Sequence, residues 1–189
     1  MSVQVCSLNH NTGRGAEELD GMDTVASVQR IAFEPGDDEV VSLGGLRVVF
    51  KLDGRDTGDA FSIVEHPVAP GTLVPPHTHE HEDEFSYVVY GTIGARIGGE
   101  DYELGPGSYL KKPRGISHAF WNANREPAHL IEIISPAGFE QYFREVAPVL
   151  AGGPGIDPAQ IEAVAIRYGL TFQWEQLPEL MERYGVSLS

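Results

Sequence analysis

The sequence has a single cysteine, Cys6, among 189 residues. One thiol can neither close a disulfide within the chain nor build a thiolate metal cluster. This cysteine usage is typical of a reducing compartment, and we expect a cytoplasmic protein. The first 21 residues also lack the basic segment followed by an apolar segment that a secretion signal requires.

Basic residues are also scarce, with 13 Lys and Arg against 28 Asp and Glu, which gives a formal net charge of −15. A charge of this sign opposes binding to phosphate backbones and to anionic membranes, so we expect neither nucleic acid nor a membrane as a partner. No run is long and apolar enough to cross a bilayer. The length and the hydrophobic fraction of 41% instead indicate one globular domain with a substantial core.

The stretch from Gly71 to Asn122 contains a pattern of potential metal ligands. His77 and His79 are two residues apart and therefore lie on the same side of a strand. A carboxylate, Glu84, follows five residues later, and His118 comes after a turn marked by glycine and proline. Three imidazoles and one carboxylate suit Fe, Ni, Mn, Cu or Zn and suit Ca or Mg poorly. We therefore predict a site for one divalent transition metal ion.

These two blocks resemble the two signature motifs of the cupin superfamily. The first motif is glycine, HxH, glutamate, glycine, and it matches residues 71–91; the second is glycine, PxG, histidine, asparagine, and it matches residues 107–122. With the strands that such a barrel needs, the resemblance covers roughly residues 46–135. It implies a homodimer and places metal ligands at His77, His79, Glu84 and His118.

The predicted fold is all-β, a double-stranded β-helix or jelly-roll cupin barrel, followed by C-terminal α-helices. We expect a mobile N-terminal arm at 1–27, the barrel at 28–135, and a helical extension at 136–189 that packs on the barrel or at a dimer interface. After residue 136 the apolar period changes from 2 to 3.6. The expected strands are 28–33, 46–52, 60–68, the HxH strand, 85–93, 94–99 paired with 100–104, 108–112, 116–122 and 128–135.

Alternation also predicts which side chains face the metal. If Glu84 points inward, Ser86, Val88 and Tyr90 do so as well. On the strand of His118, the residues that share its face are Ile116, Phe120 and Asn122, and Phe120 is as compatible with the core as with a pocket. The predicted substrate pocket is Ser86, Val88, Ile116 and Phe120, whereas we interpret His66, His81 and His129 as structural.

The size, the complete ligand set and the helical tail resemble quercetinase-like cupin dioxygenases. This resemblance implies a metal-dependent dioxygenase that acts with O₂ on a flavonol-like or other enolisable aromatic small molecule, with Glu84 as the candidate base. Two alternatives remain: a redox-neutral metal-dependent isomerase or hydrolase, and a non-enzymatic small-molecule-binding cupin. Fold alone does not choose among them.

Overall fold

The computed structural model describes residues 31–34, 36, 38–152 and 157–188. The predicted N-terminal arm at 1–27 lies outside these ranges. Of the strand predicted at 28–33, the described residues 31–33 are not in a strand. The first strand of the described chain is β1 (Val40–Leu43), which the sequence did not indicate because it is short and only half-buried.

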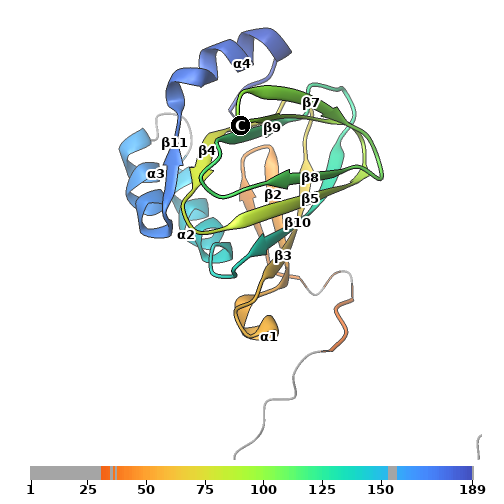
Figure 1. Cartoon of the computed structure of the whole chain (residues 1–189), viewed down its shortest axis with the longest axis vertical. Coiled ribbons are helices and arrows are strands. Elements are labelled where there is room, and N and C mark those ends of the chain that lie inside the picture. The colour runs from red at the N-terminus through yellow and green to blue at the C-terminus, as the bar shows by residue number, and fades with distance from the viewer. Residues whose placement is uncertain (1–30, 35, 37, 153–156, 189) are drawn as a thin grey trace, which may run out of the picture.

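Two antiparallel sheets face each other in a jelly roll (Figure 1). The six-stranded sheet has the order β1-β2-β3-β10-β5-β8, and the five-stranded sheet has the order β11-β4-β9-β6-β7. The mostly β architecture and the C-terminal helices confirm the predicted fold class. Besides β1, the strands are β2 (Leu46–Leu52), β3 (Ser62–Val68), β4 (Leu73–His79), β5 (Asp83–Tyr90), β6 (Ile93–Ile97), β7 (Glu100–Leu104), β8 (Tyr109–Lys112), β9 (His118–Trp121), β10 (Ala128–Ser135) and β11 (Leu170–Phe172).

The single strand predicted over 85–93 is two strands, because the chain turns at Gly91. This residue has a φ of 77°, and a Cβ atom there would lie 2.6 Å from the Cα of Ala128. Only glycine fits such a turn against a neighbouring backbone. The hairpin predicted through Gly98 and Gly99 is confirmed, since β6 pairs with β7 around these two residues.

In Figure 1, α2 (Glu140–Leu150) and α3 (Pro158–Ala165) lie at the left of the sheets, α4 (Leu177–Tyr184) lies above them and α1 (Gly54–Thr57) lies below. The connection between the strands expected at 46–52 and 60–68 contains the short helix α1. Asp157 caps α3 by accepting a hydrogen bond from the backbone N–H of Ala159, as its Asp-Pro sequence predicts. The helices are α1 (Gly54–Thr57), α2 (Glu140–Leu150), α3 (Pro158–Ala165) and α4 (Leu177–Tyr184), with 3-10 turns η1 (Ile166–Tyr168) and η2 (Trp174–Gln176).

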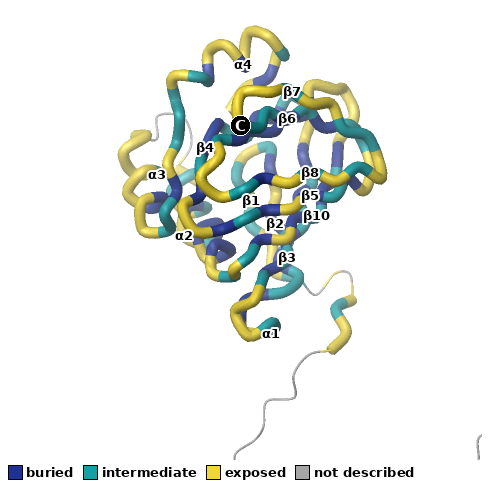
Figure 2. The backbone as a smooth tube through the Cα atoms, in the orientation of Figure 1, coloured by how far each residue is buried: buried dark blue, intermediate teal, exposed yellow. Residues whose placement is uncertain are grey.

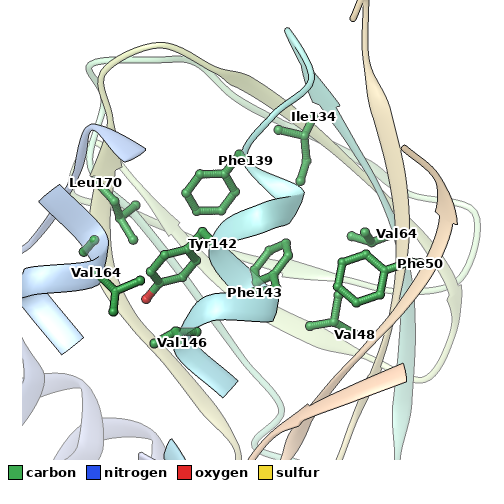
Figure 3. Packing of buried hydrophobic residues seen from close by; sticks show 11 residues of the cluster. Val48, Phe50, Val64, Ile134, Phe139, Tyr142, Phe143, Val146, Val164 and Leu170 are labelled. Atoms are coloured by element: carbon green, nitrogen blue, oxygen red, sulfur yellow. The ribbon is translucent and has the colours of Figure 1, made fainter. Parts of the chain in front are cut away.

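Helix α2 packs its apolar stripe against the barrel. Figure 3 shows this stripe between strand residues on one side and residues of α3 and β11 on the other. These buried side chains recur at the helical period read from the sequence, and α2 packs them against residues of the strands. The stripe consists of Phe139, Tyr142, Phe143 and Val146.

The C-terminal extension also adds a strand that the sequence did not predict. β11 pairs with β4, so that Phe172 lies opposite His77 and Leu170 lies opposite His79. Figure 2 shows buried positions along strands of both sheets; they alternate with less buried positions along β3 and β10, whereas all four residues of β9 are buried. Through β11, the C-terminal extension pairs with β4, the strand that carries the HxH motif. Within the described residues, no helix is long and apolar enough to cross a membrane.

Candidate metal centre

The four predicted ligands come together from both sheets. β4 pairs with β9 so that His77 is directly opposite His118, and His79 lies on the same face of β4. Glu84 comes from β5 in the facing sheet. One ligand atom from each of the four residues lies within 4.8 Å of the others, and all four side chains are buried. Residues separated by up to 41 positions (118 minus 77) thus share one small volume.

Two of the three imidazoles are oriented by a backbone carbonyl outside the cluster, and the third lies near a carboxylate. The Nδ1 atom of His77 lies 2.7 Å from the carbonyl oxygen of Pro75, and the Nδ1 atom of His118 lies 3.2 Å from that of Ile116. A carbonyl oxygen only accepts hydrogen bonds, so these Nδ1 atoms carry the protons and each Nε2 atom keeps a lone pair. The Nδ1 atom of His79 lies 3.4 Å from a carboxylate oxygen of Glu82. Such partners are typical of histidines that bind metal through Nε2.

The donor set fits a metal ion. Both ring nitrogens of His79 and the Nε2 atom of His118 are buried without a hydrogen-bond partner among the described residues. Glu84 lies close to them, 3.4 Å from His79 Nε2 and 3.1 Å from His118 Nε2, without the alignment of a hydrogen bond. Buried polar atoms are rarely left unpaired, because the lost hydration is costly. A cation among these atoms would satisfy them.

Burial keeps the imidazoles in the form that binds metal. Burial lowers the pKa of His77 well below its ordinary value, and the neighbouring His118 and His79 lower it further. Burial also lowers the pKa of His118, although Glu84 acts in the opposite direction. Neutral imidazole is the ligand form. His77 and His118 are therefore in the form that binds a cation at neutral pH.

A buried lysine, which the sequence did not suggest as a site residue, adjoins the cluster. The Nζ atom of Lys112 lies 2.8 Å from Glu84 and 2.7 Å from Glu132. The hydroxyl of Ser86 donates to both oxygens of Glu132, at 3.2 and 2.9 Å. The side chain of Lys112 is only 2% exposed, and those of the two glutamates are 5% and 1% exposed. Two carboxylates and one ammonium group therefore form a closed network beside the metal ligands.

The network sets the charges of its members. Burial alone would raise the pKa of Glu84, but Lys112, His79 and His118 together hold it well below its usual value. Burial raises the pKa of Glu132 to about 7, although Lys112 opposes that shift. Burial disfavours the charge of Lys112, but the two carboxylates outweigh this effect and raise its pKa. Glu84 is therefore ionised at neutral pH, whereas Glu132 is near its midpoint.

A cavity of about 150 Å³ opens beside the ligands. An engineered apolar cavity of about this volume binds benzene. Metal ligands His77 and Glu84 line one part of it, together with Lys112 and Glu132. The remaining walls are mainly apolar, and the C-terminal extension contributes many of them, including Phe139, Tyr142, Phe143, Leu170, Phe172 and Trp174. The site is thus suited to an aromatic ligand with oxygen atoms at one end.

Of the four predicted pocket residues, Phe120 lines this cavity. Ser86 is buried in the network with Glu132, and Val88 packs in the apolar cluster with Phe120 and Leu130. Ile116 is 41% exposed and lies outside the cavity, which corrects the prediction. It precedes β9, which begins at His118, so strand alternation does not extend to it.

The prediction for Tyr90 is also wrong, because its side chain is 46% exposed. The pairing of β5 with β10 shifts register between His129 and Leu130, opposite this end of β5. Such an irregularity turns the strand, so the alternation that buries Glu84 does not carry through to its last residue.

The remaining histidines lie in different surroundings. His81 has a side chain that is 60% exposed and is not in the ligand cluster, and His129 contacts Glu65 outside the cavity. His66, in contrast, is 3% exposed and lines the cavity. Alternation along β3 could have revealed this position, since His66 shares a buried face with Val64 and Val68. Asn122, the last residue of the second motif, is structural: its side chain donates to the carbonyl oxygens of Val68 and Glu126.

Comparison with known families gives the class of this fold and site. Residues 65–134 match the family described as a cupin domain. Solved structures support the fold: KdgF from Halomonas sp. has a TM-score of 0.51 at 20% identity, covering 58% of this chain and 96% of that one. A predicted oxalate decarboxylase from Thermotoga maritima has a TM-score of 0.52 at 20% identity, covering 56% and 99%. Residues 65–134 thus form a cupin domain, and the two solved structures support the cupin fold around it.

The proteins that are similar in sequence to this chain have names that describe different functions. The chain is 29% identical over 118 residues to the tetracenomycin polyketide synthase protein TcmJ of Streptomyces glaucescens, covering 62% of this chain and 78% of the relative. It is 24% identical over 98 residues to quercetin 2,3-dioxygenase of Bacillus subtilis, covering 52% and 29%. It is 32% identical over 91 residues to mannose-1-phosphate guanylyltransferase of Escherichia coli, where it covers 48% of its own length and only 19% of the relative.

Proposed function

We propose that this cupin is a metal-dependent dioxygenase that acts on a small aromatic compound with an enol or phenol hydroxyl. The observation that carries the proposal is a cluster of three histidines and one glutamate, of which His77 and Glu84 line a cavity whose walls include several aromatic rings. The similarity to quercetin 2,3-dioxygenase supports it. We also propose that the chain forms a homodimer, which light scattering of the purified protein would test.

The four ligands would hold the metal ion through the Nε2 atoms of the histidines and a carboxylate oxygen of Glu84. A divalent transition metal bound there would stabilise the anionic form of an enol or phenol and supply the redox chemistry that a reaction with O₂ requires. The apolar walls would exclude water from the substrate, which strengthens the electrostatic interactions at the polar end. The aromatic rings of the walls would hold the substrate ring in place by offset or edge contacts.

Glu84 is the proposed proton acceptor. Because its pKa is held well below the usual range, it is ionised and able to take a proton from a substrate hydroxyl at neutral pH. Lys112 contacts both Glu84 and Glu132, so a proton gained by Glu84 would be shared with a network that contains a second carboxylate. The buried position of the network limits proton exchange with solvent to the cavity side.

Replacing Glu84 with glutamine separates its two roles. We expect Glu84→Gln to lower turnover by about 10²-fold or more, because a general base contributes roughly this much. Metal content should fall less, because three histidines remain. Turnover per bound metal is therefore the quantity to measure. If turnover and metal content decline in parallel, Glu84 acts only as a ligand.

A second candidate function is a redox-neutral reaction on an enolisable, polyketide-like compound. The alignment with TcmJ favours it, since that alignment spans more of both chains than the alignment with the dioxygenase. The same ligands and base would serve to form an enolate without O₂. The cavity alone does not distinguish the two reactions, because both need an aromatic or conjugated substrate with an acidic hydroxyl.

Oxygen consumption tests the proposed function. The purified protein, with its metal content measured, is mixed with quercetin and a panel of related enols in an oxygen electrode and, in parallel, without oxygen. A dioxygenase consumes one O₂ per substrate molecule and is inactive without oxygen. Equal conversion under both conditions would establish the redox-neutral alternative, and tight binding without conversion would establish a binding protein.

Elemental analysis of protein prepared without added metal tests the site itself. We expect about one ion per chain, and we expect His77→Ala, His79→Ala and His118→Ala each to lower metal affinity by at least 10-fold, because each removes a ligand. His129→Ala, outside the cavity, is the matched control and should keep full metal content. Full occupancy in all three ligand variants would refute the assignment.

A further inference from the structure

His66 lies in the cavity wall but belongs to neither the ligand cluster nor the lysine network. It is on β3 and only 3% exposed. Its Nδ1 atom lies 3.1 Å from the backbone carbonyl oxygen of Arg47 on the neighbouring strand β2. Because that oxygen can only accept, Nδ1 carries the proton and the Nε2 atom has a free lone pair.

The surroundings of His66 offer Nε2 no donor. The imidazole lies beside the rings of Phe120 and Phe143, with centroid distances of 6.3 and 5.6 Å. Within the described part of the chain, no hydrogen bond to Nε2 is found. Burial lowers the pKa of His66 to about 4, so the ring is neutral at physiological pH and Nε2 acts only as an acceptor.

Four other polar side chains of the cavity already have partners or belong to the ligand cluster. Lys112 and Glu132 bond to each other, and Glu132 also accepts from Ser86. His77 and Glu84 belong to the metal-ligand cluster. Besides the hydroxyl of Tyr142, His66 is therefore a neutral acceptor in the cavity wall with an unused lone pair, and it is set among aromatic rings.

We propose that the Nε2 atom of His66 accepts a hydrogen bond from a second hydroxyl group of the bound ligand, and thereby selects dihydroxylated aromatic rings over monohydroxylated ones. The inference deepens the proposed function, on which it rests for an aromatic ligand whose first hydroxyl faces the metal ligands. If the ring edge of the ligand that faces His66 carries no hydroxyl group, the buried Nε2 atom stays without a hydrogen bond. A ligand without the second hydroxyl therefore binds less well. His66 is in this view a specificity-determining residue that takes no part in the chemical step.

Binding of simple phenols to the metal-loaded protein tests the inference. Isothermal titration calorimetry measures the dissociation constants of phenol and of 1,2-, 1,3- and 1,4-benzenediol. All three diols are included because the spacing of the two hydroxyl groups on the ring determines which diol can contact both the metal-ligand cluster and His66. We expect at least one diol to bind about five- to tenfold more tightly than phenol, as one net hydrogen bond provides. We expect this ratio to fall close to one in His66→Leu, which has no acceptor.

Three further variants keep the test decisive. His66→Phe is a second acceptor-free replacement in case His66→Leu folds poorly, and His66→Gln keeps a side-chain acceptor and should restore part of the preference. His129→Leu changes a histidine that does not line the cavity, and it should leave the ratio unchanged. Metal content and the circular dichroism spectrum establish that each variant is folded and loaded.

The inference is overturned if the wild-type protein does not prefer any diol over phenol. It is also overturned if folded, metal-loaded His66→Leu or His66→Phe keeps the wild-type ratio, since the second hydroxyl would then bind elsewhere. These binding ratios do not depend on turnover. Failure of the proposed dioxygenase reaction would instead appear as absent oxygen consumption with an unchanged diol preference.

Discussion

Lys112→Met is the substitution for which the structure predicts the largest cost to stability. The side chain of Lys112 is 2% exposed, and its Nζ atom is within 2.8 Å of two carboxylates that are themselves buried. Methionine has a similar length but no charge, so the substitution leaves Glu84 and Glu132 facing each other without a cation. Removing one partner of a buried ion pair costs about 3–5 kcal/mol of unfolding free energy.

The loss of unfolding free energy in Lys112→Met should depend on whether the metal is bound. A bound cation neutralises Glu84 and leaves only Glu132 uncompensated, so we expect the free-energy loss to be larger in the metal-free protein than in the loaded one. Replacing both members, in Lys112→Met with Glu132→Met, removes the second charge as well. The double variant should recover about 2 kcal/mol or more, because apolar replacements of buried ion pairs are often neutral in stability.

Urea unfolding at pH 7.5, followed by circular dichroism, measures these differences. Lys111→Met is the matched control, since Lys111 precedes Lys112 on β8 and its side chain is exposed on the opposite face. Surface substitutions of this kind usually change stability by less than about 0.5 kcal/mol. A loss below about 1 kcal/mol in metal-free Lys112→Met, or a loss equal to that of the control, would refute the assignment of Lys112 as the buried counter-ion.

Two other predictions concern stability. The pKa of His66 is about 4 in the folded protein against an ordinary value of 6.5, so below pH 6.5 the unfolded chain binds a proton that the folded chain refuses. The contribution of neutral His66 to the unfolding free energy is present above pH 6.5 and declines as the pH falls towards 4, by about 3 kcal/mol in all. Metal-free His66→Gln should therefore lose less stability than the wild type between pH 7 and 4.5. Identical slopes of unfolding free energy against pH in the two proteins would contradict the shift. Gly94→Ala would place a Cβ atom 2.1 Å from Nε1 of Trp121 and should cost about 1–3 kcal/mol or more in thermal or urea unfolding. Gly105→Ala, where a Cβ would meet nothing within 4 Å, is the control, and an equal effect at both positions would show that the contact is relieved without strain.

The pair His77 and His79 could be read from the sequence because it depends on local spacing, whereas Glu84 and His118 were assigned from their places in the two motifs. A period of 2 places His77 and His79 on one face, whatever strand pairs with β4. The helical stripe at Phe139 and Tyr142 was visible for the same reason, since a period of 3.6 needs only neighbours in sequence. Patterns of this kind can be recognised in the sequence because each lies within one strand or helix.

Lys112, Glu132 and His66 could not be identified in this way. Alternation placed Glu132 and His129 on opposite faces of β10 but did not say which face is inward. The pairing of β5 with β8 puts Glu84 opposite Lys112, and the pairing of β5 with β10 puts Ser86 opposite Glu132. These registers join residues 28 and 46 positions apart (112 minus 84, and 132 minus 86), and no local pattern specifies them.

The sequence by itself determined that this protein has a β barrel with C-terminal helices and a cluster of three histidines and one glutamate. Only the tertiary structure decided that a lysine and a second glutamate adjoin that cluster, that His66 faces the same cavity, and that β11 and α2 supply its apolar walls. The physical reason is that side-chain direction follows from the local backbone, whereas the neighbours of a side chain follow from long-range strand pairing and packing.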